Sequence, residues 1–218
     1  MASWQLTLAS TKATGDIRCL SALARLQTLD LRYTQVTGDI SCLDSITRLQ
    51  KLGLHYTQVT GDISCINDLT SVQRLNLWIT KATGDTSCLD ALTCLRLYLN
   101  CARVTGNIAS LSALTSLHAL LLGSTQGKND IGSMSALTRM LTLDLLGTGD
   151  IGSLSALTNL QTLSLLYTLV TGDFWRRLVL DPEAERRYAL WSLPFGSPAR
   201  VMGLARPPLP QVRQSGRM

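Results

Sequence analysis

The sequence predicts an α/β solenoid, in which short parallel strands line one side of stacked coils and 3₁₀, short helical or irregular returns line the other. One observation is a five-residue stretch, Val36-Thr37-Gly38-Asp39-Ile40, that recurs along most of the chain. The residue after its glycine falls at eight positions spaced by 20 to 23 residues: Asp16, Asp39, Asp62, Asp85, Asn107, Asp130, Asp150 and Asp173. A Leu-x-Leu pair precedes each copy. A fixed period of this length indicates stacked structural repeats, here about eight coils.

Each part of the repeat predicts one element of a coil. The alternation Leu29-x-Leu31 is typical of a short strand with one buried face. Gly38 follows that strand, where we expect the chain to turn through a positive φ that glycine adopts at little cost. The spacing of three between Ile40, Leu43 and Ile46 predicts a 3₁₀-like or helical return. Because a single coil cannot bury its own apolar face, the core forms only when the coils stack.

The second copy, residues 26–48, reads L-x-x-L-x-L-x-x-T-x-V-T-G-D-I-S-x-L-x-x-I-T-x. This pattern resembles the leucine-rich repeat family over about residues 3–174. The V-T-G-D-I part is similar to the L-t-G-x-I of plant-type repeats, and S-x-L-x-x-I-T is similar to internalin-type repeats, so the unit is intermediate. The resemblance implies a horseshoe with strands on its concave face and a role in binding proteins. Thr34 occupies the family's asparagine position, where its hydroxyl can do part of that side chain's work of bonding the backbone of neighbouring coils.

The repeat ends near the C-terminus, which divides the chain into three parts. Residues 1–174 form the solenoid, 175–191 a capping segment, and 192–218 a disordered tail rich in proline and arginine. A short helix is predicted over 182–191 because Asp181, Pro182 and Glu183 form a helix-start signal. The tail's Pro207-Pro208-Leu209-Pro210 fits either a proline-motif ligand or linker composition. Since no separate cap precedes the first coil, we expect a fragment of a longer array or a partner at that end.

The distribution of charge argues against a nucleic-acid partner. Residues 1–173 contain 12 Lys+Arg and 12 Asp, so the whole excess of +5 lies in residues 174–218. The repeats therefore carry no net field that would attract nucleic acid. No apolar run approaches the ~20 residues that cross a bilayer, and the N-terminus lacks the features of a signal peptide. The sequence thus predicts a soluble, cytoplasmic protein; it leaves the oligomeric state open.

Two columns of stacked side chains are candidates for a metal site. Cysteines occupy one repeat position in four consecutive units and serine follows in the next three: Cys19, Cys42, Cys65, Cys88, Ser110, Ser133 and Ser153. A straight ladder does not surround a zinc ion, so we predict structural thiols in a slot for small residues, with disulfides or a metal as alternatives. The aspartate column could bind calcium, but an Asp in a tight turn more often bonds its own backbone. We predict no metal and no cofactor.

The residues that flank each Leu-x-Leu pair point away from the core and form the candidate site. Stacking produces a basic column beside an aromatic ridge in units two to five, the combination that protein interfaces concentrate. The predicted partner-binding residues are Arg32, Tyr33, Lys51, His55, Tyr56, Arg74, Trp78, Arg96 and Tyr98. The alternative is that strand faces favour aromatic residues by β-propensity alone. No nucleophile motif, phosphate-binding loop or zinc-protease motif is present, so we predict no enzyme.

These features favour a non-catalytic protein–protein interaction module that grips a partner with acidic and apolar groups on its concave strand face. Two other interpretations remain open. In one, the chain is the repeat portion of a larger receptor- or kinase-linked signalling protein. In the other, it is a structural, degenerating array without a specific ligand.

Overall fold

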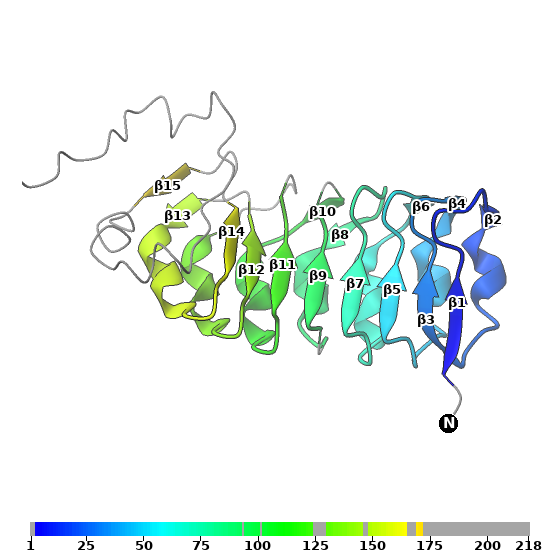
Figure 1. Ribbon diagram of the computed structural model, residues 1–218, viewed down its shortest axis with the longest axis horizontal. Coiled ribbons are helices and arrows are strands. Elements are labelled where there is room, and N and C mark those ends of the chain that lie inside the picture. The colour runs from blue at the N-terminus through cyan, green and yellow to red at the C-terminus, as the bar shows by residue number, and fades with distance from the viewer. Residues whose placement is uncertain are drawn as a thin grey trace, which may run out of the picture.

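The computed structural model describes residues 3–92, 94–100, 102–123, 130–145, 148–164 and 169–171. Within them the chain winds as a solenoid whose coils follow one another from the N-terminal end to the other end (Figure 1). The predicted helix at 182–191, the capping segment, the tail and its proline motif lie outside the described residues.

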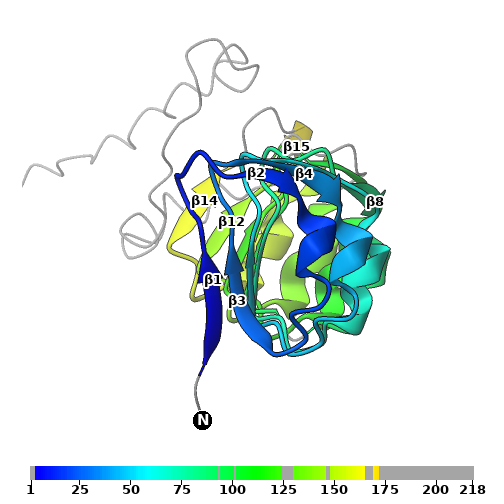
Figure 2. The same ribbon diagram turned by 90° about the vertical axis from the view of Figure 1, so that its right-hand side faces the viewer.

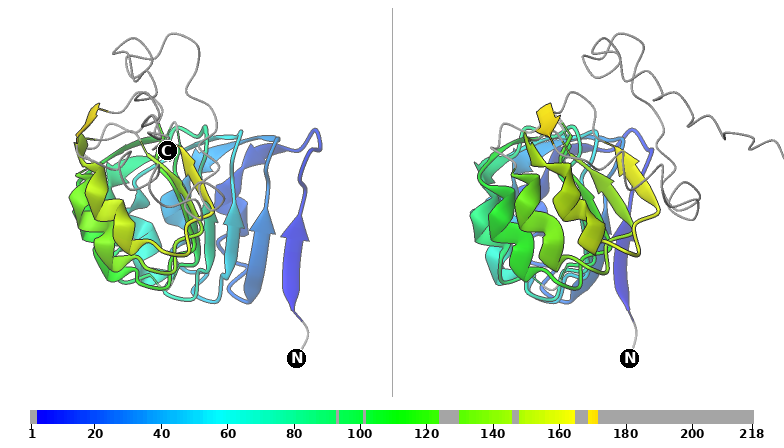
Figure 3. Two further views of the ribbon diagram at one scale, coloured as in Figure 1. Left: turned by 60° about the vertical axis from the view of Figure 1, so that its left-hand side comes forward. Right: turned by 90° about the vertical axis from the view of Figure 1, so that its left-hand side faces the viewer.

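One strand from each coil joins an eight-stranded parallel sheet. The strands lie in chain order, and Figure 3 shows them side by side along the molecule: β1 (Trp4–Thr7), β3 (Leu26–Asp30), β5 (Lys51–Gly53), β7 (Arg74–Asn76), β9 (Arg96–Tyr98), β11 (Ala119–Leu121), β12 (Thr142–Asp144) and β14 (Thr162–Ser164). Equivalent leucines are paired in register, as Leu29 with Leu52 and Leu52 with Leu75. The predicted strand in each repeat is confirmed.

The Val-Thr-Gly-Asp stretch forms a second set of strands, where the sequence led us to expect a turn. The strands are β2 (Thr14–Asp16), β4 (Gln35–Asp39), β6 (Gln58–Thr60), β8 (Thr83–Asp85), β10 (Arg103–Thr105), β13 (Thr148–Asp150) and β15 (Leu169–Thr171). The expectation was wrong because Val36 points into the core while Thr37 points outward, which is strand alternation. The prediction of positive φ holds, with Gly38 inside β4 at +115° and Gly61 directly after β6 at +106°.

Short 3₁₀ segments close the third side of each coil, as the spacing of three predicted. They are η1 (Ile17–Leu20), η2 (Ile40–Leu43), η3 (Ile63–Asp68), η4 (Thr86–Leu89), η5 (Ile108–Ala113), η6 (Ile131–Ala136) and η7 (Ile151–Ala156). The aspartate column, with Asn107 at one position, caps η1 to η6. Asp39 Oδ1 accepts a 2.8 Å hydrogen bond from the Ser41 N–H, and this bond lowers the pKa of Asp39. The column therefore serves the backbone, as predicted.

The core runs through the middle of the coils, which have three sides when seen end-on (Figure 2). Leucines of the large sheet and the apolar residues of the 3₁₀ segments meet there, and Leu31, Leu54 and Leu77 are buried. The first coil differs from the predicted pattern. Leu6 is half-buried and Leu8 is 38% exposed, because β1 has a sheet neighbour on one side only.

The threonine column bonds within its own coil, where we expected bonds to neighbouring coils. The hydroxyls of Thr34, Thr57 and Thr80 each donate to the carbonyl three residues earlier, at 2.6 to 2.7 Å. A hydroxyl is too short to reach the next coil while it satisfies the carbonyl at the strand's end. Bonds between coils come instead from the outward threonines, such as Thr60 Oγ1 to the Gly38 carbonyl at 3.3 Å.

Candidate binding face

The outer face of the eight-stranded sheet, called the strand face below, carries most of the predicted site. Register pairs Lys51 with Arg74 and Arg74 with Arg96, so the three cations lie on adjacent strands about 4.8 Å apart. All three are exposed, and none of them makes an ion pair within the residues that the structure describes. We call Lys51, Arg74 and Arg96 the basic row.

Three aromatic side chains form a continuous ladder at the end of the strands. The rings of Tyr33 and Tyr56 stack with centroids 4.7 Å apart, and Trp78 meets Tyr56 edge-on at 5.2 Å. Their side chains remain 51%, 38% and 37% exposed, in chain order. We call Tyr33, Tyr56 and Trp78 the aromatic ladder. The ring contacts confirm that these three side chains are neighbours. Trp78, however, occupies the repeat position of His55 rather than that of Tyr56.

The backbone at two of the ladder residues, and at Ile79 next to Trp78, has an uncommon conformation. Tyr33, Tyr56 and Ile79 have positive φ of 55°, 57° and 51°, which is costly for bulky residues and most of all for β-branched Ile79. Their N–H groups nevertheless extend the sheet ladder, as Tyr33 N–H donates to the His55 carbonyl at 3.0 Å. The interstrand bonds thus fix the angle at which each ring leaves the sheet. Ile79, 37% exposed, was missed as a site residue, although its repeat position is that of Tyr33 and Tyr56.

Two predicted site residues are placed differently from the rest. Arg32 pairs with Asp30 of its own coil, with Nε 3.4 Å from Oδ2. Tyr98 is half-buried and lies in register with Asn76, and it makes no ring contact with the aromatic ladder within the described residues. The structure therefore groups the basic row by strand register, and the aromatic ladder with His55 by ring contacts.

His55 lies with its ring edge-on to both stacked tyrosines, and its pKa is lowered. Its ring lies 5.2 Å from Tyr33 and 6.4 Å from Tyr56, edge-on in both cases. Burial, helped by the positive charge of Arg32, lowers the pKa of His55. Nδ1 is buried and has no hydrogen-bond partner among the described residues. Protonation would place a poorly hydrated charge against the ladder.

We expect this histidine to make the fold less stable in acid. The unfolded chain has an ordinary histidine pKa near ~6.5, so it binds more protons than the folded state below that pH. The free energy of unfolding should therefore fall as the pH drops from about 6.5 through the lowered pKa. Urea midpoints at neutral and mildly acidic pH would measure the fall. His55→Gln should show a smaller difference between the two, while an equal difference would contradict the assignment.

A second polar feature lies further along the strand face, and sequence reasoning missed it. The Asn100 Nδ2 group donates to Asp144 Oδ2 at 2.9 Å, reaching over the intervening coil. That coil has Gly123 at this position, and a Cβ there would lie 3.2 Å from Asn100 Nδ2 and 3.1 Å from Asp144 Oδ2. Asn100 Oδ1 is buried without a partner among the described residues. Only the absence of a side chain in the middle coil lets the two residues meet.

The cysteine column shows the chemistry of structural thiols. The Cys65 and Cys88 Sγ atoms donate to the carbonyls of Asp62 and Asp85 at 3.1 and 2.9 Å, and Ser110 Oγ makes the same bond to Asn107 at 2.8 Å. This shared bond explains the exchange of cysteine for serine. Burial raises the pKa of Cys65 to about 12 and that of Cys88 to about 11, so both thiols are protonated near neutral pH.

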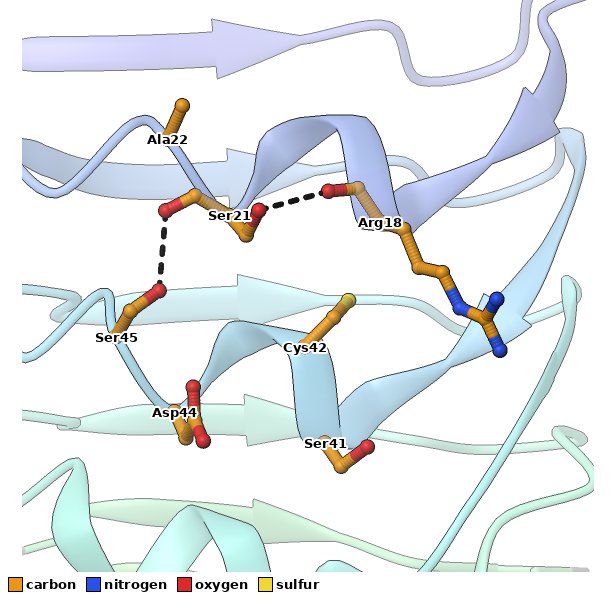
Figure 4. A pocket seen from close by; sticks show the side chains of 7 residues that line it. All are labelled: Arg18, Ser21, Ala22, Ser41, Cys42, Asp44 and Ser45. Carbon is orange, nitrogen blue, oxygen red and sulfur yellow. Dashed lines mark hydrogen bonds between the residues drawn. The ribbon is translucent and has the colours of Figure 1, made fainter.

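The cysteines from 19 to 94 are free, and no group of residues suited to a metal ion occurs in the described part of the chain. An open depression of about 650 Å³ lies beside this column, between η1 and η2. Figure 4 shows its lining, where Ser45 Oγ donates to the Ser21 carbonyl and Ser21 Oγ to the Arg18 carbonyl, at 3.0 and 2.9 Å. The hydroxyls of Ser21 and Ser45 in this lining are thus satisfied within the chain.

The fold is that of a leucine-rich repeat solenoid, and solved structures of that class resemble it. The leucine-rich repeat ectodomain of the Arabidopsis thaliana receptor kinase GASSHO1/SCHENGEN3, in complex with Casparian strip integrity factor 2, has a TM-score of 0.69 and 28% identity. The match covers 78% of this chain and 22% of that one. The Arabidopsis HAESA ectodomain, in complex with an extended IDA peptide hormone, gives 0.70 and 27%, over 78% of this chain and 31% of that one.

A bacterial structure resembles the chain as well. Internalin C2 of Listeria monocytogenes has a TM-score of 0.64 and 25% identity, covering 86% of this chain and 80% of that one. The predicted resemblance to both plant-type and internalin-type repeats is thus confirmed. No family model and no curated protein matches the sequence. None of the helices in the described part of the chain is long and apolar enough to span a membrane.

Proposed function

We propose that this protein is a non-catalytic interaction module that binds a protein partner on its strand face. The observation that carries the proposal is the aromatic ladder, exposed on a regular sheet beside a basic row without carboxylate partners. Tyr33, Tyr56 and Trp78 are the anchors, and Lys51, Arg74 and Arg96 supply the charge. Arg32, His55 and Tyr98 complete the proposed site, with His55 edge-on to the two tyrosines of the ladder.

Physical cost supports a binding role for the ladder. Exposed aromatic rings leave apolar surface in water. This exposure does not improve the packing of the core, which Leu31, Leu54 and Leu77 already fill. Aromatic and arginine side chains dominate binding energy at protein interfaces.

A larger signalling protein is the second candidate, and the lengths of the similar plant ectodomains favour it. This chain spans 22% and 31% of the two described above, both of which belong to receptor kinases in complex with a factor or a peptide hormone. Under this proposal the strand face would perform the same binding step as part of a longer array. The cytoplasmic location and the lack of catalysis stay predictions.

The double variant Tyr56→Ala/Trp78→Ala tests the binding face. Affinity capture from native lysate first identifies proteins that wild type retains, and the affinity of a purified candidate is then measured for both forms. Removing two central aromatic anchors, each contributing about 2 kcal/mol, should weaken binding roughly a hundredfold or more. Circular dichroism should remain unchanged.

The matched control is Thr142→Ala/Thr162→Ala, which truncates the same face at strands β12 and β14, away from the ladder. Its affinity should stay within about twofold of wild type. Equal affinity of wild type and the aromatic variant would overturn the site. Equal tolerance of substitutions at Tyr56, Trp78 and Thr142 would favour a structural array without a ligand.

A further inference from the structure

We propose that the strand face binds an extended protein segment of defined polarity, with an acidic residue over the basic row and a lysine or arginine over Asp144. The two side chains would stand about three to five residues apart in the segment. This inference rests on the proposed function and adds the chemistry and the orientation of the partner. It follows from how charge is distributed along the strands.

The strand face has one aspartate that is paired with an arginine and another, Asp144, that is not paired within the described residues. Asp30 lies beside Arg32 of its own coil and the two form an ion pair at 3.4 Å. Asp144 occupies the same register column as Asp30, because Asp30 pairs with Gly53, Gly53 with Asn76, and so on to β12. Yet Asp144 makes no ion pair within the described residues. The basic row and Asp144 thus remain available to charges from outside.

The surroundings of Asp144 suit a cation. Asp144 is half-buried, and among the described residues its side chain accepts one bond, from the Asn100 amide at 2.9 Å. Gly123 leaves the coil between them without a side chain, and the amide and the carboxylate meet in that space. An ammonium or guanidinium group would bring charged donors to the part of Asp144 that stays exposed.

The distance between the two ends sets the length of the segment. Arg96 pairs with Ala119 and Ala119 with Thr142, so Asp144 lies two strands away and two residues further along. With strands ~4.8 Å apart and a rise of ~3.3 Å per residue, this separation is about 12 Å, or close to four residues of extended chain. Ala119 and Leu121 lie between the ends, so the segment should carry small or apolar residues between its two charges.

This arrangement disfavours a uniform polyanion. A nucleic-acid strand would place phosphates over the basic row and further phosphates over Asp144, where like charges repel. A segment with one acidic and one basic side chain gains at both ends. The structure therefore favours a protein segment over nucleic acid on this face.

A library of labelled peptides tests the inference without a known partner. Each peptide has a Gly-Ala-Leu background, one Phe, one Glu and one Lys, with none to eight residues between Glu and Lys and with both orders represented. Fluorescence anisotropy against the full-length protein should give the tightest binding at a separation of three to five residues. Replacing Lys by Gln in that peptide should weaken binding about tenfold.

Two protein variants then assign each end. Asp144→Asn keeps an oxygen that can accept from Asn100 and should abolish the preference for Lys while the preference for Glu remains. Arg74→Gln/Arg96→Gln should do the reverse. Asp30→Asn is the matched control, since Asp30 has the same column position but is already paired with Arg32, and it should change neither preference.

Three outcomes would overturn the inference: no optimum in the spacing, an unchanged Lys preference in Asp144→Asn, or tighter binding of poly-Glu or an oligonucleotide than of the best mixed peptide. These outcomes are separate from the test of the proposed function. If Tyr56→Ala/Trp78→Ala loses partner binding but the peptides show no spacing optimum, the proposed binding face is supported. The proposed arrangement of one acidic and one basic residue in the partner is then contradicted.

Discussion

Replacing Gly61 by alanine should destabilise the protein by about 2–3 kcal/mol. Gly61 has φ +106°, where an L side chain is strained by about 1–2 kcal/mol. A Cβ at this position would also overlap Asp39 Oδ1 of the preceding coil, the atom that caps η2 by accepting the Ser41 N–H. Displacing that cap costs about 1 kcal/mol more. Urea denaturation followed by circular dichroism measures the sum.

The same substitution at Gly15 separates the two causes. Gly15 has φ +119° and a Cβ there would meet no atom within 4 Å. Gly15→Ala should therefore lose only the backbone contribution, about 1–2 kcal/mol. If both variants lost the same free energy of unfolding, the Asp39 carboxylate would move away from a Cβ at position 61 at no cost. The predicted contribution of the displaced cap would then be wrong.

The parts of the fold that the sequence predicted are those decided within one coil. Leu29 and Leu31 alternate, Ile40 and Leu43 are three apart, and Asp39 precedes a short turn of helix. Each of these patterns has a local physical cause, so the strand, the 3₁₀ segment and the cap all formed where expected. Repetition then placed equivalent residues on adjacent strands, because a constant period keeps the register.

What the sequence did not predict depends on contacts between coils. The Val36-Thr37-Gly38 stretch was interpreted as a turn because of its glycine, but pairing with the coils on either side extends it into strands. Leu8 has the same repeat position as the buried Leu54 and is exposed nonetheless, since burial there requires a coil on each side. Pattern within a repeat cannot show which coils have two neighbours.

The candidate site divides in the same way. The basic row followed from register alone, and the structure confirms that Lys51, Arg74 and Arg96 are adjacent. The ring contacts of the aromatic ladder depend on positive φ at Tyr33 and Tyr56, which no sequence rule assigns to tyrosine. The bond from Asn100 to Asp144 could have been suspected from Gly123 in the aligned column, because a missing side chain lets the neighbours on both sides reach each other.

The second large expected effect is on stability, at a core leucine of a coil that has a neighbouring coil on each side. Leu54→Ala should lower the free energy of unfolding by about 3–4 kcal/mol, within the range for a fully buried leucine that leaves a cavity. Leu54 is 0% exposed and belongs to the third coil, which packs on coils at both sides. Since stability in a solenoid depends on interfaces between neighbouring repeats, one cavity weakens two interfaces. The transition should also broaden, because the coils on either side become less tightly coupled.

Leu8→Ala is the matched control, as Leu8 has the same repeat position in the first coil and is 38% exposed. Its loss should stay below about 1 kcal/mol, because less apolar surface leaves water there and the cavity opens to solvent. Urea unfolding measured by tryptophan fluorescence and by circular dichroism would report both the midpoint and the width. Equal losses at the two positions would mean that the first coil is as well covered as the third, and the exposed N-terminal edge would then have to be buried by something other than the described chain.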